Sequence, residues 1–108
     1  MALKETTVVN MRNASYDVAI DRSSPFGNPF HLGKDGDRAV VLEKYRAYFY
    51  KRVEEDEDFK RKVLTLRGRK LGCWCAPLLC HGGIIVEYIE NYYALRDAAK
   101  PMDFRRPQ

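Results

Sequence analysis

The chain has 108 residues, 45% of them hydrophobic and 31% charged, values that fit one globular domain and exclude a disordered or low-complexity protein. The formal net charge of +4 suits an anionic ligand, but it is too small to indicate nucleic-acid binding by itself. No apolar run approaches the roughly 20 residues that span a bilayer, and no secretory signal follows Met1. We therefore expect a cytoplasmic protein without a membrane partner, in a compartment where thiols stay reduced.

The N-terminal third predicts two short strands and a long loop. Thr6–Met11 is rich in β-branched residues and Tyr16–Ile20 alternates apolar with polar residues, so we expect two strands that pair with each other. Residues 22–36 hold three glycines and two prolines without any regular period, which is typical of a long functional or disordered loop. Three apolar side chains that could anchor it favour an ordered loop: Phe26, Phe30 and Leu32.

The middle of the chain predicts two helices. Asp37 is a suitable N-cap for a helix through about Glu54. The acidic residues 54–58 fit the start of a second helix, because the helix dipole favours carboxylates there. This second helix is expected to end near Arg67, just before Gly68. The first helix has an apolar face at helical spacing, formed by Val41, Tyr45, Tyr48, Phe49 and Val53.

A third strand and a third helix are predicted to follow. Along Arg69–Cys75, alternation places the cysteines on one face and Trp74 on the other, where we expect Trp74 to be buried against a helix. The last helix should begin near Cys80 or His81, and residues 97–108 should be a loose tail. The expected buried stripe of this helix is Ile85, Tyr88, Ile89, Tyr92 and Leu95.

These elements predict a single α/β domain over residues 1–96, with a small sheet of about three strands and about three helices. If the third strand runs parallel to the first, the glycine-rich loop and the cysteine segment both lie at the carboxyl ends of strands. Open α/β sheets usually bind their ligands there.

Residues 72–83 concentrate the metal-binding side chains of the chain. They contain Cys73, Cys75, Cys80 and His81, which include all three cysteines and one of the two histidines. Three thiolates and an imidazole suit tetrahedral Zn²⁺, and His31 could replace His81 if the loop folds over the segment. The sequence therefore predicts a zinc cofactor, although the spacing is not that of an ordinary zinc finger.

Two other interpretations of this segment stay open. Cys80 could be a nucleophile assisted by His81 in a metal-free catalytic site, because a helix N-terminus favours the thiolate form. Alternatively, Cys73 and Cys75 are small core residues on a buried strand, and His81 is a polar group at a helix end.

The glycine-rich loop is a second candidate site. Arg12, Arg22, Asn28 and Lys34 could hold an anion or a carbonyl-rich ligand, and the glycines would let the backbone approach it. A rigid surface turn is the alternative.

We expect residues 27–33 to fold against residues 73–83, because neither stretch has enough apolar residues to be ordered alone. Arg22, Asn28 and Cys80 would then line one pocket.

Four motifs together resemble the domain-of-unknown-function family 4326 of bacteriophages and bacteria, over about residues 7–96: Val8-Val9-Asn10, Gly27-Asn28-Pro29-Phe30, Asp35-Gly36-x-Arg38 and Cys73-Trp74-Cys75-x-Pro77-x-x-Cys80-His81-Gly82. Two positions depart from the pattern of that family. Gly83 replaces an aspartate and Asp21 replaces a glycine, and either change could mark an altered or lost activity. The resemblance implies that one site contains Asn10, Arg12, Arg22, Gly27, Asn28, Pro29, Phe30, Arg38, Cys73, Cys75, Cys80, His81 and Gly82.

From these observations we expect a small enzyme that acts on an anionic, nucleotide or nucleobase-like substrate. Cys80 and His81 would be catalytic, and the ligand would contact Asn10, Arg12, Arg22, Gly27, Asn28, Phe30 and Lys34. The alternative is a non-catalytic module, stapled by zinc, that binds a host protein or nucleic acid. The sequence leaves open whether the protein is an enzyme and whether it is a homodimer.

Overall fold

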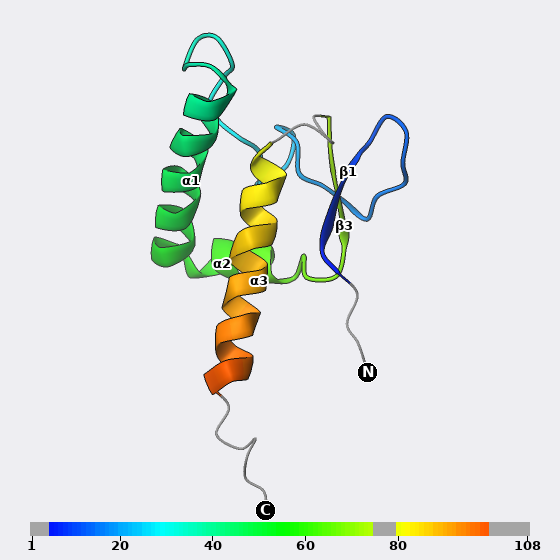
Figure 1. Ribbon diagram of the computed structural model, residues 1–108, viewed down its shortest axis with the longest axis vertical. Helices are drawn as coiled ribbons and strands as arrows, with labels where there is room; N and C mark the ends of the chain where they lie inside the picture. The colour runs from blue at the N-terminus through cyan, green and yellow to red at the C-terminus, as the bar shows by residue number, and fades with distance from the viewer. Residues whose placement is uncertain (1–4, 75–79, 100–108) are drawn as a thin grey trace, which may run out of the picture.

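The computed structural model describes residues 5–74 and 80–99. Within them, three helices pack on one three-stranded parallel sheet (Figure 1), which confirms the expected α/β class. In chain order the elements are β1 (Thr7–Asn10), β2 (Val18–Ala19), α1 (Arg38–Glu55), α2 (Glu57–Leu64), β3 (Lys70–Cys73) and α3 (His81–Ala99).

The sheet has β3 at its centre, in the order β1-β3-β2, and both neighbours run parallel to it. The expected parallel arrangement of the first and third strands is therefore confirmed. The expected pairing of the first two strands is wrong, because the connection between them crosses one face of the sheet. Met11 and Tyr16 of this connection lie over Gly72, where an added Cβ would come within 2.6 Å of Met11 Cγ.

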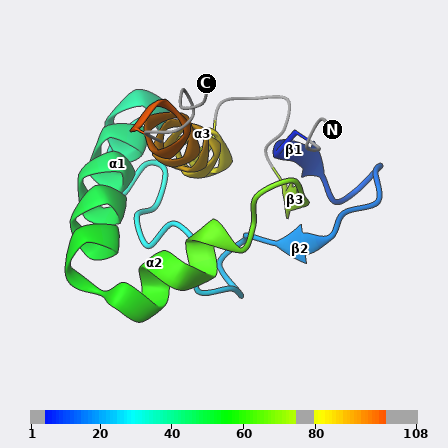
Figure 2. The same ribbon diagram turned by 90° about the horizontal axis from the view of Figure 1, so that it is seen from below.

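The three helices cover the opposite face of the sheet (Figure 2). Tyr45 and Phe49 of α1 are fully buried there, together with Leu71 of β3. Burial of large apolar side chains in this layer is the main source of stability. Other core side chains come from all three helices and from the turn after α2: Val53, Phe59, Val63, Leu66, Ile85 and Ile89.

Helices α1 and α2 begin where the sequence predicts. The Asp37 carboxylate accepts a hydrogen bond from Val40 N at 3.0 Å, and Asp56 does the same for Phe59 N at 3.0 Å. α2 ends at Leu64 rather than near Arg67, since residues 65–68 form a turn that closes with Gly68 at a φ of 77°.

Trp74 is exposed, so the expectation that it is buried against a helix is wrong. β3 ends at Cys73, and 53% of Trp74 is accessible to solvent. The alternation itself holds, because Leu71 and Cys73 are buried on the helical side. In the described part of the chain, however, all three helices lie on that side (Figure 2). Trp74, which alternates to the other side, is therefore left exposed.

α3 carries its buried stripe only along its first half. Ile85 and Ile89 are fully buried, but Leu95 is 71% exposed, which corrects the expected stripe. The reason is visible in Figure 1, where the C-terminal turns of α3 extend beyond the sheet and the other helices. The helix also continues to Ala99, past the expected domain boundary at residue 96. No helix among residues 5–74 and 80–99 is both long and apolar enough to cross a membrane.

Candidate functional site

The glycine-rich loop is ordered by anchors in the core and in its own backbone. Phe26 is only 6% exposed, and its carbonyl oxygen accepts a hydrogen bond from the buried Tyr45 hydroxyl at 2.9 Å. Gly27 packs against the preceding turn, because an added Cβ would lie 2.6 Å from Asp21 O. The role of Gly27 is therefore close backbone packing.

Arg22 and Asn28 fix the centre of this loop. Asn28 Oδ1 accepts a hydrogen bond from Phe30 N at 2.8 Å, which closes a tight turn. The Arg22 guanidinium donates to the carbonyl oxygens of Asn28 and of Phe30, the second at 2.9 Å. These two bonds set the plane of the guanidinium and hold the loop in one shape.

The end of the loop leads directly into α1. Asp35 Oδ2 accepts from His31 N at 2.7 Å, a bond that lowers the pKa of the Asp35 carboxyl. The chain then reaches Asp37, the N-cap, which places Arg38 in the first turn of the helix. His31 and Lys34 are exposed at the tip, and neither lines the cavity described next.

A cavity of about 80 Å³ lies between the loop, the start of α1 and the start of α3. It brings Arg22, Asn28 and Cys80 together, as expected from the sequence. Polar groups and apolar side chains both contribute to its wall. The lining residues are Arg22, Asn28, Phe30, Leu32, Arg38, Val41, Leu42, Cys80 and His81.

His81 is the first residue of α3 and is buried, with 8% exposure. Its Nε2 lies 2.6 Å from Ile20 O, and because a carbonyl oxygen only accepts, Nε2 carries the hydrogen. Burial lowers the pKa of His81, and the bond to Ile20 only partly opposes this. The imidazole is therefore neutral at pH 7, with Nδ1 as its proton acceptor.

Cys73 and Cys80 are in direct contact, with their Sγ atoms 3.4 Å apart and no disulfide between them. Cys73 is 1% exposed at the end of β3. Cys80 is half-buried and immediately precedes α3, so it reaches the cavity while Cys73 lies behind it.

The predicted zinc ligands are only partly brought together. Cys75 lies outside the described residues, and the described ones contain no group of three metal-ligating side chains. His81 could ligate only through Nδ1, because Nε2 donates to Ile20 O. Cys73 and Cys80 fit as two adjacent thiolate ligands, so the zinc set stays a prediction that depends on Cys75.

Asn10 and Arg12 do not line the cavity. Asn10 Nδ2 donates to Trp74 O at 3.4 Å, and Asn10 Oδ1 accepts from Arg12 N at 2.9 Å. The Arg12 guanidinium lies 5.8 Å from the centre of the Trp74 ring, and the indole Nε1 donates to Asp21 Oδ2 at 3.1 Å. These residues form a separate polar cluster at the carboxyl edge of the sheet.

The motif spacing alone does not predict the apolar wall of the cavity. Leu32 was expected to anchor the loop, but its side chain is 53% exposed, so that expectation is wrong. Val41 was expected only as part of a buried helix face. Leu42 carries no sequence signal of its own. Arg38 was indicated only by the resemblance, although its place just after the N-cap of α1 could have shown that it meets the loop.

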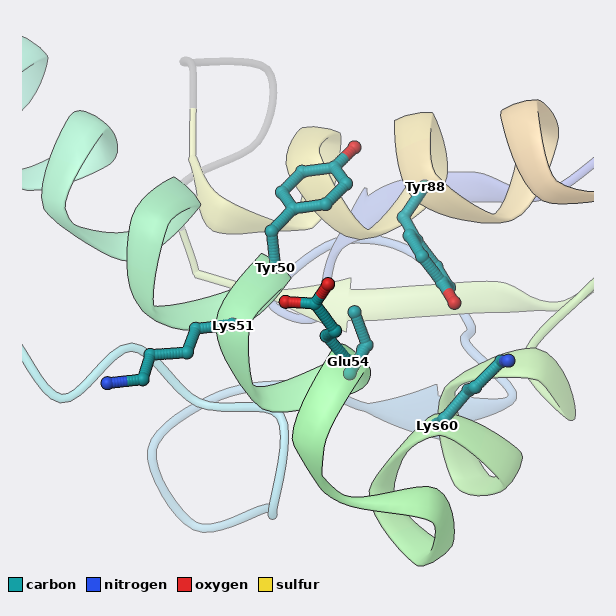
Figure 3. A pocket seen from close by; sticks show the side chains of 6 residues that line it. Tyr50, Lys51, Glu54, Lys60 and Tyr88 are labelled. Atoms are coloured by element: carbon teal, nitrogen blue, oxygen red, sulfur yellow. The ribbon is translucent and has the colours of Figure 1, made fainter.

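A larger hollow of about 580 Å³ lies on the helical side (Figure 3), but it lacks the predicted chemistry. Burial raises the pKa of Tyr50 to about 12, and its hydroxyl donates to Glu87 at 2.8 Å. In Figure 3 Lys51 points away from Tyr88. No thiol or imidazole is among its lining residues, which are Tyr50, Lys51, Val53, Glu54, Lys60 and Tyr88.

Comparisons with known proteins give a family and two viral relatives. The sequence profile described as domain of unknown function 4326 matches residues 3–91. An uncharacterised 12.4 kDa protein of Enterobacteria phage T4, from the nrdA-td intergenic region, is 37% identical over 87 residues, covering 80% of this chain and 79% of the relative. An uncharacterised protein of Acanthamoeba polyphaga mimivirus is 28% identical over 80 residues, covering 64% of this chain and 58% of that protein. No solved structure matches the chain significantly.

Proposed function

The chain belongs to the family of domain of unknown function 4326, and we propose that it is a small enzyme in which Cys80 attacks a nucleotide or nucleobase-like compound. One observation carries the proposal. A single cavity joins the Cys80 thiol and the His81 imidazole with the guanidinium groups of Arg22 and Arg38 and with Asn28. A thiol, a neutral base and cationic binding groups are the parts that nucleophilic catalysis on an anionic substrate needs.

The charges around the cavity favour an anion and an activated thiol. Arg22 and Arg38 supply two permanent positive charges. Cys80 immediately precedes α3, whose N-terminal N–H groups carry a partial positive charge. Both effects stabilise a thiolate at Cys80 and a negatively charged group beside it.

The size of the cavity limits what can enter it. Pockets that enclose a drug-sized ligand hold about 300–1,000 Å³, whereas this cavity holds about 80 Å³. Only a compact group of the substrate, such as a phosphate or the polar edge of a base, fits inside. The remainder of a nucleotide lies outside the cavity, against the loop or the start of α3.

We assign a chemical role to each residue from its place around the cavity. The Cys80 sulfur adds to the carbon of a C=N bond in the compound, the π electrons of that bond pass to its nitrogen, and His81 Nδ1 takes the proton of the thiol. Arg38 and Asn28 hold the polar group, while Phe30 and Leu32 keep bulk water from the reacting atoms. Arg22 positions the loop through its bonds to Asn28 O and Phe30 O.

A binding screen by thermal shift tests the proposal. Nucleoside mono- and diphosphates and free nucleobases are added to the wild type, to Arg38→Gln and to the control Arg96→Gln, which removes the same charge at the far end of α3. At least one compound should raise the melting temperature of the wild type. Because a charge-assisted hydrogen bond contributes about 1.5–3 kcal/mol, Arg38→Gln should bind that compound roughly tenfold more weakly or worse. Equal binding by the two variants, or no shift with any compound, contradicts the proposal.

A second candidate function, the non-catalytic module stapled by zinc, is supported by the contact between Cys73 and Cys80. With Zn–S bonds of about 2.3 Å, two thiolates on one tetrahedral zinc lie about 3.8 Å apart, close to the 3.4 Å between the two Sγ atoms. Elemental analysis decides between the candidates. The module requires about one zinc per chain and a melting temperature that falls when a chelator is added. Metal-free protein with an unchanged melting curve leaves the thiol enzyme.

A further inference from the structure

We infer that Cys73 and Cys80 form a redox pair, in which a small hydroperoxide oxidises Cys80 and Cys73 then closes a disulfide with it. The inference does not depend on the proposed function, because it requires only that Cys80 be oxidised at the cavity. It assigns a distinct role to Cys73, which the proposed catalysis does not use.

The distance between the two sulfurs carries the inference. Their Sγ atoms are 3.4 Å apart, and a disulfide bond is about 2.05 Å long. Closing the bond therefore shortens this distance by about 1.4 Å. The two residues belong to different elements, since Cys73 ends β3 and Cys80 precedes α3.

The unequal exposure of the two thiols divides the roles between them. Cys80 is half-buried and lines the cavity, so a small molecule in the cavity meets this sulfur first. Cys73 is 1% exposed and is not among the lining residues. Cys73 is thus shielded from the oxidant but is in contact with the sulfur that the oxidant modifies. This is the arrangement of a resolving cysteine beside an attacking one.

The two steps balance without any further reactant. The Cys80 sulfur attacks one oxygen of the hydroperoxide, the O–O bond breaks, and the other oxygen takes the proton of the Cys80 thiol and leaves as an alcohol or water, while Cys80 becomes a sulfenic acid. The Cys73 sulfur then attacks the Cys80 sulfur, and the hydroxyl group leaves as water with the proton of the Cys73 thiol. Two electrons pass from the dithiol to the peroxide, and a low-molecular-weight thiol can restore both cysteines by exchange.

The disulfide would also protect the site. A sulfenic acid that meets no second thiol can be oxidised further to a sulfinic acid, which is generally irreversible. Rapid attack by Cys73 stops this oxidation at a reversible stage. While the disulfide persists, Cys80 cannot act as a nucleophile.

Disulfide mapping after treatment with hydrogen peroxide tests the inference. The reduced protein is oxidised, its remaining thiols are alkylated, and the chain is cleaved with chymotrypsin, because Trp74, Leu78 and Leu79 separate the three cysteines. The wild type and Cys75→Ser, which both keep the proposed pair, should yield a fragment in which Cys73 is joined to Cys80. Dithiothreitol should reverse the bond.

Two variants check the roles. Cys73→Ala should accumulate sulfinic acid at Cys80, and Cys80→Ser should leave Cys73 reduced, with oxidation of Cys73 slowed at least tenfold. The inference is overturned if wild type mainly forms a disulfide through Cys75. It is also overturned if Cys75→Ser accumulates Cys80 sulfinic acid while Cys73 stays reduced, or if a bound metal keeps both thiols unreactive until it is removed. The wild type and Cys75→Ser decide the question even where a variant at the buried Cys73 fails to fold.

Discussion

At the scale of single residues, the polar side chains of the cavity are held by hydrogen bonds of their own. His81 is fixed through Ile20 O and Arg22 through two loop carbonyls. Asn28 is fixed by the amide of Phe30. Because these bonds join groups of the protein to one another, they hold the three side chains in fixed orientations around the cavity.

The exposed position of Trp74 gives a direct prediction at this scale. Trp74→Ala should cost at most about 1 kcal/mol of unfolding free energy, since the indole is 53% exposed and loses mainly one hydrogen bond. Urea unfolding of the two proteins measures the change. In the folded wild type, acrylamide should readily quench the fluorescence of this single tryptophan. A loss of about 3–5 kcal/mol, typical of truncating a core aromatic, would contradict the exposed position.

For the side chains around the cavity, residue type was the most informative signal in the sequence. The thiol of Cys80 and the polar groups of Arg22 and Asn28 were identifiable from residue type and from their setting in Gly- and Pro-containing stretches. The exposure of Trp74 was not predictable in the same way. Alternation along a strand shows which residues share a face, but not whether a helix covers that face.

At the scale of elements, the first turn of α3 joins the sheet to the cavity. Gly82 allows this close approach, because an added Cβ would lie 3.0 Å from Ile20 Cδ1 and from the methyl groups of Val8. At Gly83 an added Cβ would meet nothing within 4 Å. The chain thus offers two adjacent glycines in one helix with opposite surroundings.

These glycines form a matched pair for substitution by alanine. Gly83→Ala should stabilise the protein by about 0.5–1 kcal/mol, because alanine is the better helix residue and has room there. Gly82→Ala should lose that gain and cost about 1 kcal/mol overall, because Ile20 and Val8 must move. Thermal or urea unfolding of both variants measures the difference. A Gly82→Ala protein as stable as Gly83→Ala would mean that α3 does not sit this close to the sheet.

A second element-scale prediction concerns the ion pair that joins α1 to α3. Hydrogen bonds from Arg46 and then from Tyr50 lower the pKa of Glu87. A carboxyl with a lowered folded-state pKa stabilises the protein fully above the unfolded-state pKa, about 4.3, and loses this contribution as the pH falls through the folded-state value. Since the Glu87 side chain is 38% exposed, we expect the contribution to be below about 1 kcal/mol.

Urea unfolding at pH 7 and pH 3 measures this contribution. Glu87→Gln should be less stable than the wild type at pH 7, and the difference should shrink at pH 3. Glu90→Gln, a substitution at an exposed position of the same helix, serves as the control. At pH 7 its unfolding free energy should differ less from that of the wild type. If the unfolding free energies of wild type and Glu87→Gln differ by the same amount at both pH values, the Glu87 ion pair does not contribute to the stability of the folded protein.

Local sequence patterns predicted the helices better than they predicted which strands pair. The N-cap residues Asp37 and Asp56 lie next to the segments that they order, so the starts of α1 and α2 were readable. The pairing of β2 with β3 joins segments about 50 residues apart, and the adjacent strands β1 and β2 gave no sign of it. Likewise, periodicity placed Leu95 on the buried face, but the C-terminal turns of α3 extend beyond the sheet and the other helices of the described residues, and Leu95 is 71% exposed.

At the scale of the whole molecule, the parallel sheet brings the two candidate stretches together. The three strands end at the same edge, so the loop after β2 and the start of α3 after β3 meet there. The sequence predicted this meeting from motifs and from the need of both stretches for a partner. It could not give the small volume of the cavity, whose apolar lining residues Leu32, Val41 and Leu42 come from the loop and from α1.

The most direct test of this account is the rate at which iodoacetamide alkylates Cys80, measured by mass spectrometry with and without the compound that gives the largest thermal shift. A ligand in the cavity covers the Cys80 sulfur but leaves the exposed Trp74 side of the sheet free. The account predicts that a saturating ligand slows alkylation of Cys80 at least tenfold in the wild type and in Arg96→Gln. At the same ligand concentration, Arg38→Gln should be protected much less. A Cys80 that reacts at the same rate with and without bound ligand would show that the ligand binds elsewhere, and that this cavity is not the active site.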